Sequence, residues 1–215
     1  MPLDPAAHAE SLYAGSHRAG SNGEERERLW RYLFDGPFPD RAAFDNALRE
    51  KSIFPDAVFF AILENANSQA TGFASYMRME PRHRVMEVGG ILFTPALQRT
   101  AAATEAMYLM AKHAFEDLGY RRYEWKCDAL NAPSRSAALR LGFSFEGIFR
   151  QHMIVKGRNR DTAWFSMLDT EWPARKANLE RWLDASNFDA NGRQKTSLSH
   201  SNATAKAEAG HAFSY

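Results

Sequence analysis

A segment in the middle of the chain has the composition of a phosphate-binding loop. Its sequence, LFTPALQRTAAATEA over residues 92–106, joins an apolar strand end to the start of a helix. The first turn of a helix presents backbone N–H groups without intrahelical acceptors, together with the positive end of the helix dipole. Small side chains at residues 101–103 would let a pyrophosphate approach that backbone, and Arg99 could add positive charge. Alanines also favour helix for its own sake, so both interpretations stay open at this point.

The same segment lacks the features of a nucleoside triphosphatase or a metal site. No Gly-Lys-Ser/Thr follows it, and no carboxylates that could hold Mg²⁺ accompany it, which argues against a nucleotide-binding switch. Cys127 is the only cysteine, which excludes an internal disulfide framework and a cysteine-based zinc cluster. We expect Cys127 to be a buried structural thiol, and we expect no metal ion.

The elements that position this loop alternate between strand and helix. Short apolar runs bounded by turn residues predict a hairpin, residues 57–63 and 70–77, and a third strand at 85–93. The clearest helix follows, because apolar residues recur at helical spacing over 103–118 and Gly119 then closes it.

The second half of the chain continues the alternation. It predicts a buried strand at 122–127, a short helix at 133–141 ended by Gly142, and a final hairpin of residues 148–155 and 162–168 joined by the turn KGRNRD. A helical crossover links the strands at 85–93 and 122–127, so this middle pair should be parallel. The fold class is therefore α/β, or α+β, with a mixed sheet.

The chain as a whole predicts one domain with a helical entry. Three polar helices are expected within residues 4–50, starting at Pro5, at Glu24 and after the cap residue Asp40. The sheet and its loops occupy residues 56–169, and a terminal amphipathic helix covers 172–183, which gives a domain of residues 1–185. Residues 186–215 are rich in Ser, Asn, Ala and Gly, and we expect them to be disordered.

Charge and hydropathy restrict the partners. Lys and Arg total 27 against 26 for Asp and Glu, and a net charge of +1 gives no reason to expect nucleic acid or an anionic membrane as partner. No apolar run approaches the roughly 20 residues that span a bilayer. The lone cysteine and the polar start of the chain favour a cytoplasmic location.

Two motifs, in order, resemble the GNAT superfamily of N-acetyltransferases. Residues 98–103 (QRTAAA) resemble the cofactor motif Gln/Arg-x-x-Gly-x-Gly/Ala, with Ala101 where glycine is commonest, and residues 131–134 (NAPS) followed by Gly142-Phe143 resemble the Asn-x-x-Ser and Gly-Phe segment. The sequences ATEA, WRYL and GPF at 103–106, 30–33 and 36–38 are similar to the ribosomal-protein N-acetyltransferase branch. Relatives usually place a strand before the first helix, whereas here a helix is predicted from Pro5.

The resemblance implies a mostly antiparallel GNAT sheet with a central parallel pair, and acetyl-coenzyme A as cosubstrate without metal. Backbone groups of the strand end would pair with the pantetheine as if it were another strand. Gly89 and Gly90 would form a bulge near the thioester, or would be small only for packing. The implied cofactor-binding residues are Leu92, Phe93, Thr94, Gln98, Arg99, Thr100, Ala101, Ala102, Ala103, Thr104, Asn131 and Ser134.

The resemblance also implies catalytic roles. Glu87 stands eleven residues before Gln98, where several relatives carry a general base, although an ion-paired strand carboxylate with proton removal through water is the alternative. Ser134 matches the residue thought to act near the coenzyme A sulfur as acid or hydrogen-bond donor, and its alternative is a helix-start residue. Asn131 would bind the pantetheine or form the turn before Pro133. Trp30 and Phe38 could wall the acceptor site.

The expected function is therefore acetyl transfer to a primary amine, either a small molecule or a protein N-terminus. The alternatives are transfer of a longer acyl group and a non-catalytic module that binds coenzyme A. Whether the protein forms a homodimer is left open. The acceptor itself is not readable from one chain, because variable loops form its walls.

Overall fold

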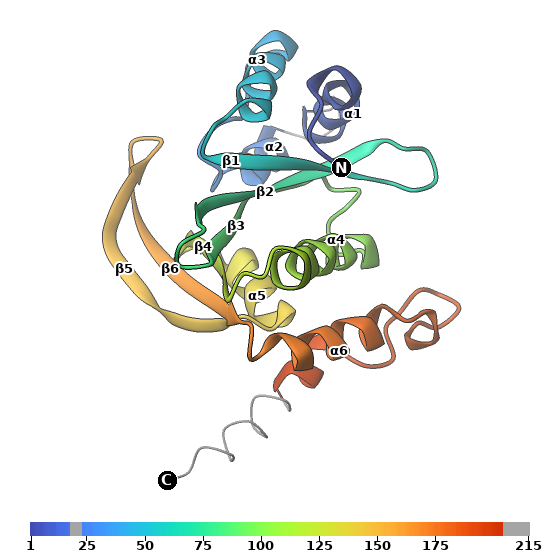
Figure 1. Cartoon of the computed structure of the whole chain (residues 1–215). Helices are drawn as coiled ribbons and strands as arrows, with labels where there is room; N and C mark the ends of the chain where they lie inside the picture. The colour runs from blue at the N-terminus through green and yellow to red at the C-terminus, as the bar shows by residue number, and fades with distance from the viewer. Residues whose placement is uncertain (18–22, 204–215) are drawn as a thin grey trace.

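The computed structural model describes residues 1–17 and 23–203 of the chain. A six-stranded sheet runs in the order β1-β2-β3-β4-β6-β5 (Figure 1). Only β3 and β4 pair in parallel, as the helical crossover between them predicts. The strands are β1 (Ala57–Leu63), β2 (Ala70–Glu80), β3 (Val85–Phe93), β4 (Arg122–Asp128), β5 (Ser144–Val155) and β6 (Arg158–Leu168).

Two groups of helices cover the two faces of the sheet (Figure 1). On one face lie α1 (Pro5–His17), α2 (Gly23–Trp30) and α3 (Arg41–Ser52); on the other lie α4 (Ala101–Lys112), α5 (Ala132–Leu141) and α6 (Trp172–Leu183). Local signals set several boundaries. The Asp40 carboxylate accepts from the N–H of Ala43 at the start of α3, and Gly142 ends α5 in the left-handed conformation with φ +103°.

Each face has its own apolar core. Buried residues of β1, β2 and β3 pack with Leu12, Trp30, Phe44 and Leu48 from the entry helices. The larger core, on the other face, joins the sheet to α4, α5 and α6, and there Phe115 and Trp172 stack with their ring centroids 5.2 Å apart. Because both faces are covered, the functional groups must lie where strands separate or where helices begin.

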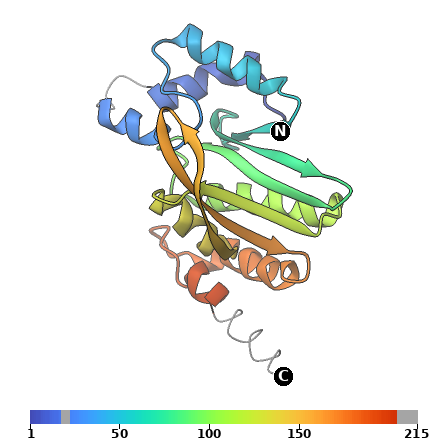
Figure 2. The same ribbon diagram turned by 90° about the vertical axis from the view of Figure 1, so that its left-hand side faces the viewer.

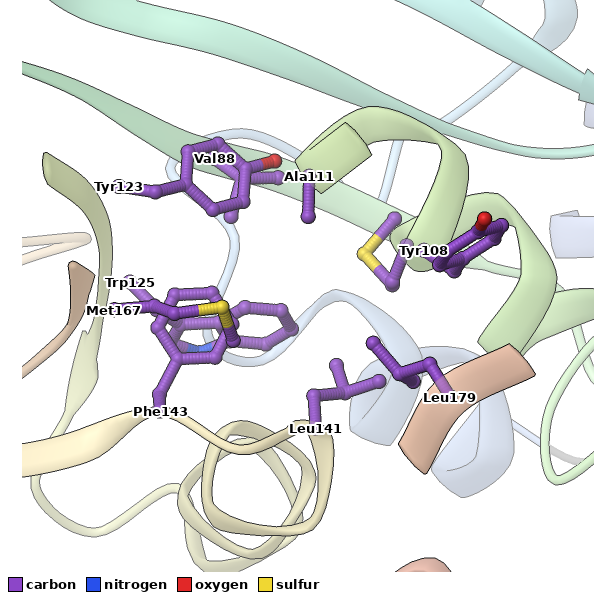
Figure 3. Close-up of a pocket in the computed structure, with 10 residues that line it drawn as sticks. Val88, Tyr108, Ala111, Tyr123, Trp125, Leu141, Phe143, Met167 and Leu179 are labelled. Carbon is purple, nitrogen blue, oxygen red and sulfur yellow. The ribbon is translucent and has the colours of Figure 1, made fainter. Parts of the chain in front are cut away.

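A small void remains inside the larger core (Figure 3). Val88, Trp125, Phe143 and Leu179 are among its lining residues, and its volume is about 10 Å³. That is room for about one water molecule, so the void is a packing defect and not a substrate site.

The N-terminal residues add an isolated β-bridge to β1 that the sequence did not predict. Pro2 pairs antiparallel with Phe60, and two backbone bonds of 2.9 Å, Leu3 N–H to Phe59 O and Ala61 N–H to Met1 O, flank it. Residues that pair with β1 therefore do precede the first helix, although they form no strand of the sheet. Three residues that include a proline carry too little periodicity to be read as a strand.

The final hairpin is longer than predicted. Its arms reach Val155 and Arg158, so the turn is not KGRNRD but only Lys156 and Gly157. Both residues have positive φ, +50° and +72°, which is the geometry of a two-residue turn that follows the twist of the strands. The hairpin tip reaches α2 (Figure 2), where the Lys156 ammonium donates to the carbonyl of Trp30 at 2.8 Å.

The expectation of disorder after residue 185 is wrong for residues 186–203. This segment folds back on α6: Leu198 is fully buried, the Trp182 indole N–H donates to Gln194 at 2.7 Å, and the Asn202 amide donates to the carbonyl of Arg140. Polar composition suggested disorder, but the amide side chains here satisfy buried backbone groups. Residues 204–215 lie outside the described residues.

None of the described helices is long and apolar enough to cross a membrane.

Candidate active site

The central strands separate halfway along their length. Parallel pairing joins β3 and β4 only from Val85 with Arg122 to Val88 with Trp125, although both strands continue beyond those positions. The edge of β3 that faces β4 therefore has no strand partner from Gly89 to Phe93 within the described part of the chain. Unpaired strand edges offer backbone donors and acceptors to an extended ligand.

A bulge lies at the point of separation. Phe73 of β2 pairs with Leu92, but Ser75 pairs with Gly89, so β3 carries one residue more than β2 between these pairs. Gly90 has φ +57°, a conformation that favours glycine, and the Ser75 hydroxyl donates to the Gly89 carbonyl at 2.9 Å. Packing restricts size as well, because a Cβ on Gly89 would lie 2.8 Å from the Met77 sulfur. The bulge and the packing explanation therefore both apply.

The phosphate-loop candidate lies just beyond the open strand edge, at the start of α4. Thr100 caps this helix, since its hydroxyl accepts from the N–H of Ala103 at 3.1 Å. Ala101 and Ala102 are exposed, and their N–H groups have no acceptor within the helix. Arg99 is exposed and has φ +63°, which turns the chain sharply into the helix. These residues form a positively polarised surface to which a phosphate has access.

Several residues predicted to bind the cofactor are engaged elsewhere. The Thr94 N–H and hydroxyl both donate to the carbonyl of Thr71, and Thr94 is 1% exposed. The Thr104 hydroxyl is buried and accepts from Arg140 at 3.0 Å, and the Gln98 amide donates to the carbonyl of Phe93. Thr94, Thr104 and Gln98 thus shape the loop through their side chains. Ala103 faces inward at 8% exposure.

The second motif starts α5, beside the end of β4. The Asn131 side chain caps the helix by accepting from the N–H of Ser134 at 3.2 Å, so the turn-forming role is present, and its amide N–H₂ is left for a ligand. The Ser134 hydroxyl oxygen accepts from the Trp125 indole N–H at 3.0 Å, and its own O–H is placed to hydrogen-bond with the Cys127 thiol. Burial raises the pKa of the Cys127 thiol, although the Ser134 hydroxyl opposes this shift. That agrees with a structural thiol.

Glu87 lies at the vertex where β3 and β4 separate, on the face away from α4. It is 4% exposed, and its Oε2 is 3.0 Å from Lys126 Nζ and 3.4 Å from Arg78 Nη1. Burial raises the pKa of Glu87, while Lys126 and Arg78 oppose the rise. A Cβ on Gly89 would lie 3.3 Å from Oε1, so this second oxygen faces the bulge.

Lys126 connects Glu87 to a longer charged network. Its ammonium also lies 2.7 Å from Glu124 Oε2 and 3.9 Å from the centre of the Trp164 ring. Arg122 binds Glu124 at 2.6 Å and forms two bonds to Glu146, at 2.8 and 2.5 Å. Burial acts to raise the pKa of Glu124, but its bonds to Lys126 and Arg122 lower it overall. Alternating charges thus lead from the vertex to the surface.

The sequence analysis missed this network although a signal for it was present. Arg122, Glu124, Lys126 and Asp128 alternate along one strand, and period two places them on one face of the sheet. The buried residues between them dominated the prediction of an entirely buried strand.

Arg160 is a second residue that the sequence analysis missed. It is 7% exposed, donates to the Thr162 hydroxyl at 3.2 Å and lies 5.2 Å from the centre of the Phe34 ring. Burial lowers the pKa of Arg160, and no described residue forms an ion pair with it. Asp128 and Glu87 act on its charge from a distance, and a buried guanidinium with no carboxylate in contact is a candidate for binding an anionic group.

The structure does not place Trp30 on an open surface. Trp30 is fully buried, and its ring packs edge-on against Phe38 and Phe44 at 5.2 and 6.4 Å, so the predicted wall role is wrong for this side chain. Phe38 is half-buried in the same cluster, and its N–H donates to His17. The large indole is needed to fill the space between α1, α3 and the sheet.

No group of three or more His, Cys, Asp or Glu side chains in residues 1–17 and 23–203 could hold a metal ion.

Comparison with known families identifies the chain over most of its length. A family model described as an acetyltransferase (GNAT) domain matches residues 5–144. This range contains the open edge of β3, the start of α4 and the start of α5.

Solved structures and curated proteins agree with this match. A GCN5-related N-acetyltransferase from Brucella melitensis is 46% identical, with 94% of this chain and 89% of that chain covered and a TM-score of 0.89. A probable acetyltransferase of the GNAT family from Chromobacterium violaceum is 45% identical, with coverage of 81% and 84% and a TM-score of 0.73. The putative ribosomal N-acetyltransferase YdaF of Bacillus subtilis is 26% identical over 71% of this chain and 85% of its own length.

Proposed function

The chain belongs to the GNAT family of acetyltransferases, and we propose that it transfers the acetyl group of acetyl-coenzyme A to a primary amine by direct attack in a ternary complex. In such a reaction the amine nitrogen bonds to the thioester carbonyl carbon and the carbon–sulfur bond breaks. The amine loses a proton and the departing thiolate gains one. The protein must therefore bind the thioester, accept one proton and supply another.

The open edge of β3 supports binding of the pantetheine. Backbone groups of Leu92 and Phe93 lie on the part of β3 that has no partner on the β4 side, and the exposed first turn of α4 begins at Ala101, eight residues beyond Phe93. The N–H groups of Ala101 and Ala102, with the guanidinium of Arg99, suit a pyrophosphate. The Thr94 N–H is already bonded to Thr71, so Thr94 contributes by holding the loop.

Glu87 is the proposed base, acting through its Oε1. Its Oε2 is held by Lys126 and Arg78, whereas Oε1 faces the bulge at Gly89. Because the carboxylate is almost fully buried, we propose that a water molecule carries the proton from the amine to it. A raised pKa makes Glu87 a better proton acceptor near neutral pH than an ordinary carboxylate.

Ser134 is the proposed donor to the departing sulfur. The Trp125 indole N–H occupies an acceptor site on its oxygen and so orients the hydroxyl, whose proton would turn from the Cys127 thiol to the sulfur of the ligand. An unperturbed serine is a very weak acid, so its contribution is a hydrogen bond to the developing thiolate.

The acceptor is proposed to be a primary amine with an acidic group nearby, and a protein N-terminus is the first choice. The name of the B. subtilis relative, a putative ribosomal N-acetyltransferase, supports a ribosomal acceptor, and a protein N-terminus is one such amine. The buried guanidinium of Arg160, which contacts no carboxylate in the described residues, supports a carboxylate beside the amine.

The unpaired edge of β3 beside the start of α4 is the main observation behind this proposal. Measuring the binding of acetyl-coenzyme A tests it. Calorimetry in the presence of a metal chelator should show one acetyl-coenzyme A bound per chain. A screen that monitors thiol release should then compare peptides with Asp, Ala or Lys at the second position, along with small amines. Lack of binding, or binding that requires Mg²⁺, would overturn the proposal, and a preference for Lys peptides would overturn the acceptor assignment.

A further inference from the structure

An open hollow lies at the opposite end of β3 from the α4 start. Its volume is about 400 Å³, and three separate segments line it: the β2–β3 turn, the start of β4 and the end of β6. Its lining residues are Arg82, His83, Arg84, Val85, Arg121, Arg122 and Leu168. Five of these seven carry basic side chains, and none is acidic.

Most of this positive charge is not neutralised. Arg122 is paired with Glu124 and Glu146, as described above. In contrast, Arg82, Arg84 and Arg121 are exposed, and none of the three forms an ion pair with another residue in the described ranges. Three guanidinium groups around one hollow repel each other, and an anion between them would remove that repulsion.

The backbone holds the three segments together. The carbonyl of Arg84 accepts from the N–H groups of both Arg121 and Arg122, at 2.9 and 3.2 Å, and the carbonyl of Arg121 accepts from Asp169 at 2.9 Å. Arg84 itself has φ +53°, a conformation that non-glycine residues adopt rarely. The starting points of the arginine side chains are thus fixed relative to one another, which reduces the entropy lost on binding.

We propose that this hollow is a binding site for a compact polyphosphate anion, separate from the acetyl-transfer site. Guanidinium groups bind phosphate oxygens with two parallel hydrogen bonds, and a volume of about 400 Å³ falls within the range of small-ligand sites. No Phe, Tyr or Trp side chain lines the hollow to stack on a base, so the phosphate chain and not a nucleobase is recognised. A single hollow also differs from the extended basic stripe that a nucleic acid requires.

The test is calorimetric titration of the full chain with inorganic tripolyphosphate. Saturating coenzyme A is present, so that the candidate pyrophosphate site at α4 is filled and cannot take up tripolyphosphate. A second titration uses the variant Ala101→Glu without coenzyme A. In that variant the α4 site is blocked, so the titration isolates the hollow even if coenzyme A does not bind. We expect one tripolyphosphate per chain in both cases. The double variant Arg84→Gln/Arg121→Gln should weaken binding at least about tenfold. The matched control Arg28→Gln/Arg193→Gln makes the same change in net charge elsewhere and should change the dissociation constant less than about twofold.

Each outcome decides. Equal weakening by the two double variants would show general charge attraction and overturn the site, as would the absence of tripolyphosphate binding. Adenosine triphosphate should bind within about threefold of tripolyphosphate, because both present the same phosphate chain. A single-stranded RNA that binds in competition with tripolyphosphate, and at least about tenfold more tightly, would overturn the compact-ligand assignment in favour of a nucleic-acid surface. None of these results depends on acetyl transfer.

Discussion

Lys126 Nζ lies 3.0 Å from Glu87 Oε2, and both side chains are almost completely buried, at 4% and 5% exposure. The ion pair lies where β3 and β4 separate, and Glu87 on β3 is in register with Glu124 on β4. Two carboxylates directly opposite each other would repel, and Lys126 bridges them. The proposed base is therefore part of a charged cluster whose protonation depends on one lysine.

The first prediction concerns Glu87 itself. Glu87→Gln should keep the affinity for acetyl-coenzyme A but lower kcat/KM by about 10²-fold, because a positioned proton acceptor is lost. The loss should shrink at high pH, where more of the amine is already neutral. Steady-state rates between pH 6 and 10 measure both effects, with the exposed Glu50→Gln as control. Unchanged turnover at neutral pH would reject the base role and leave deprotonation in solution.

Lys126→Met should destabilise the protein by about 3–5 kcal/mol, because it leaves two buried carboxylates without their cation. The sign of the pH effect follows from the raised pKa of Glu87. A carboxyl group whose pKa is higher in the folded than in the unfolded protein stabilises the folded state most at pH values below its unfolded pKa. This contribution to stability is lost as the pH rises through the pKa of the folded protein. Removing Lys126 raises that pKa further.

The stability loss in Lys126→Met should therefore be larger at pH 8 than at pH 5 when urea unfolding is measured at both. Lys176→Met breaks a partly exposed pair with Glu116 and should lose much less stability than Lys126→Met, with little change between the two pH values. A loss that does not change with pH would contradict the proposed coupling.

Ser134→Ala should reduce kcat/KM by an amount that corresponds to about 1.5–3 kcal/mol, the range for a hydrogen bond to a charged group, and the reduction should be the same at every pH. This flat profile differs from the one expected for Glu87→Gln. The exposed neighbour Ser136→Ala on the same helix is the matched control. If Ser134→Ala changes only thermal stability, through the lost partner of the Trp125 indole, the hydroxyl has a structural role alone.

Ala101→Glu should abolish binding of acetyl-coenzyme A, because a bulky negative side chain would meet the pyrophosphate at the first turn of α4. The matched control is Ala42→Glu, an exposed alanine in the first turn of α3. Calorimetry and thermal unfolding of both variants separate lost binding from lost folding. Equal affinity in the two variants would show that the cofactor does not lie against α4.

Leu198→Ala should lower the free energy of unfolding by about 2–5 kcal/mol, since Leu198 is fully buried in the segment that folds back on α6. Leu130→Ala, at a residue 78% exposed, should change it by less than about 0.5 kcal/mol. Urea unfolding measures both. A small effect at Leu198 would mean that the segment after α6 adds little to the stability of the domain.

The sequence by itself determined the elements and their order. Short apolar runs bounded by turn residues predicted the bounds of β1 and β3, the spacing of apolar residues predicted α4, and Asp40 and Gly142 predicted helix ends. These signals are local, since a cap or a turn depends on residues within about four positions along the chain. The helical crossover then fixed which strands are parallel.

Only the tertiary structure decided what the site residues contact. Lys126 meets Glu87 because of the register between two strands separated by a helix, and Trp30 is enclosed because α1 and α3 close around it. Thr94 and Thr104 match a binding motif, yet their hydroxyls bond to Thr71 and Arg140 from other segments. Composition suggested disorder after residue 185, although α6 provides a surface for Leu198. Local patterns report on neighbours in the chain, whereas each of these contacts joins distant residues whose meeting depends on how the whole sheet and its helices pack.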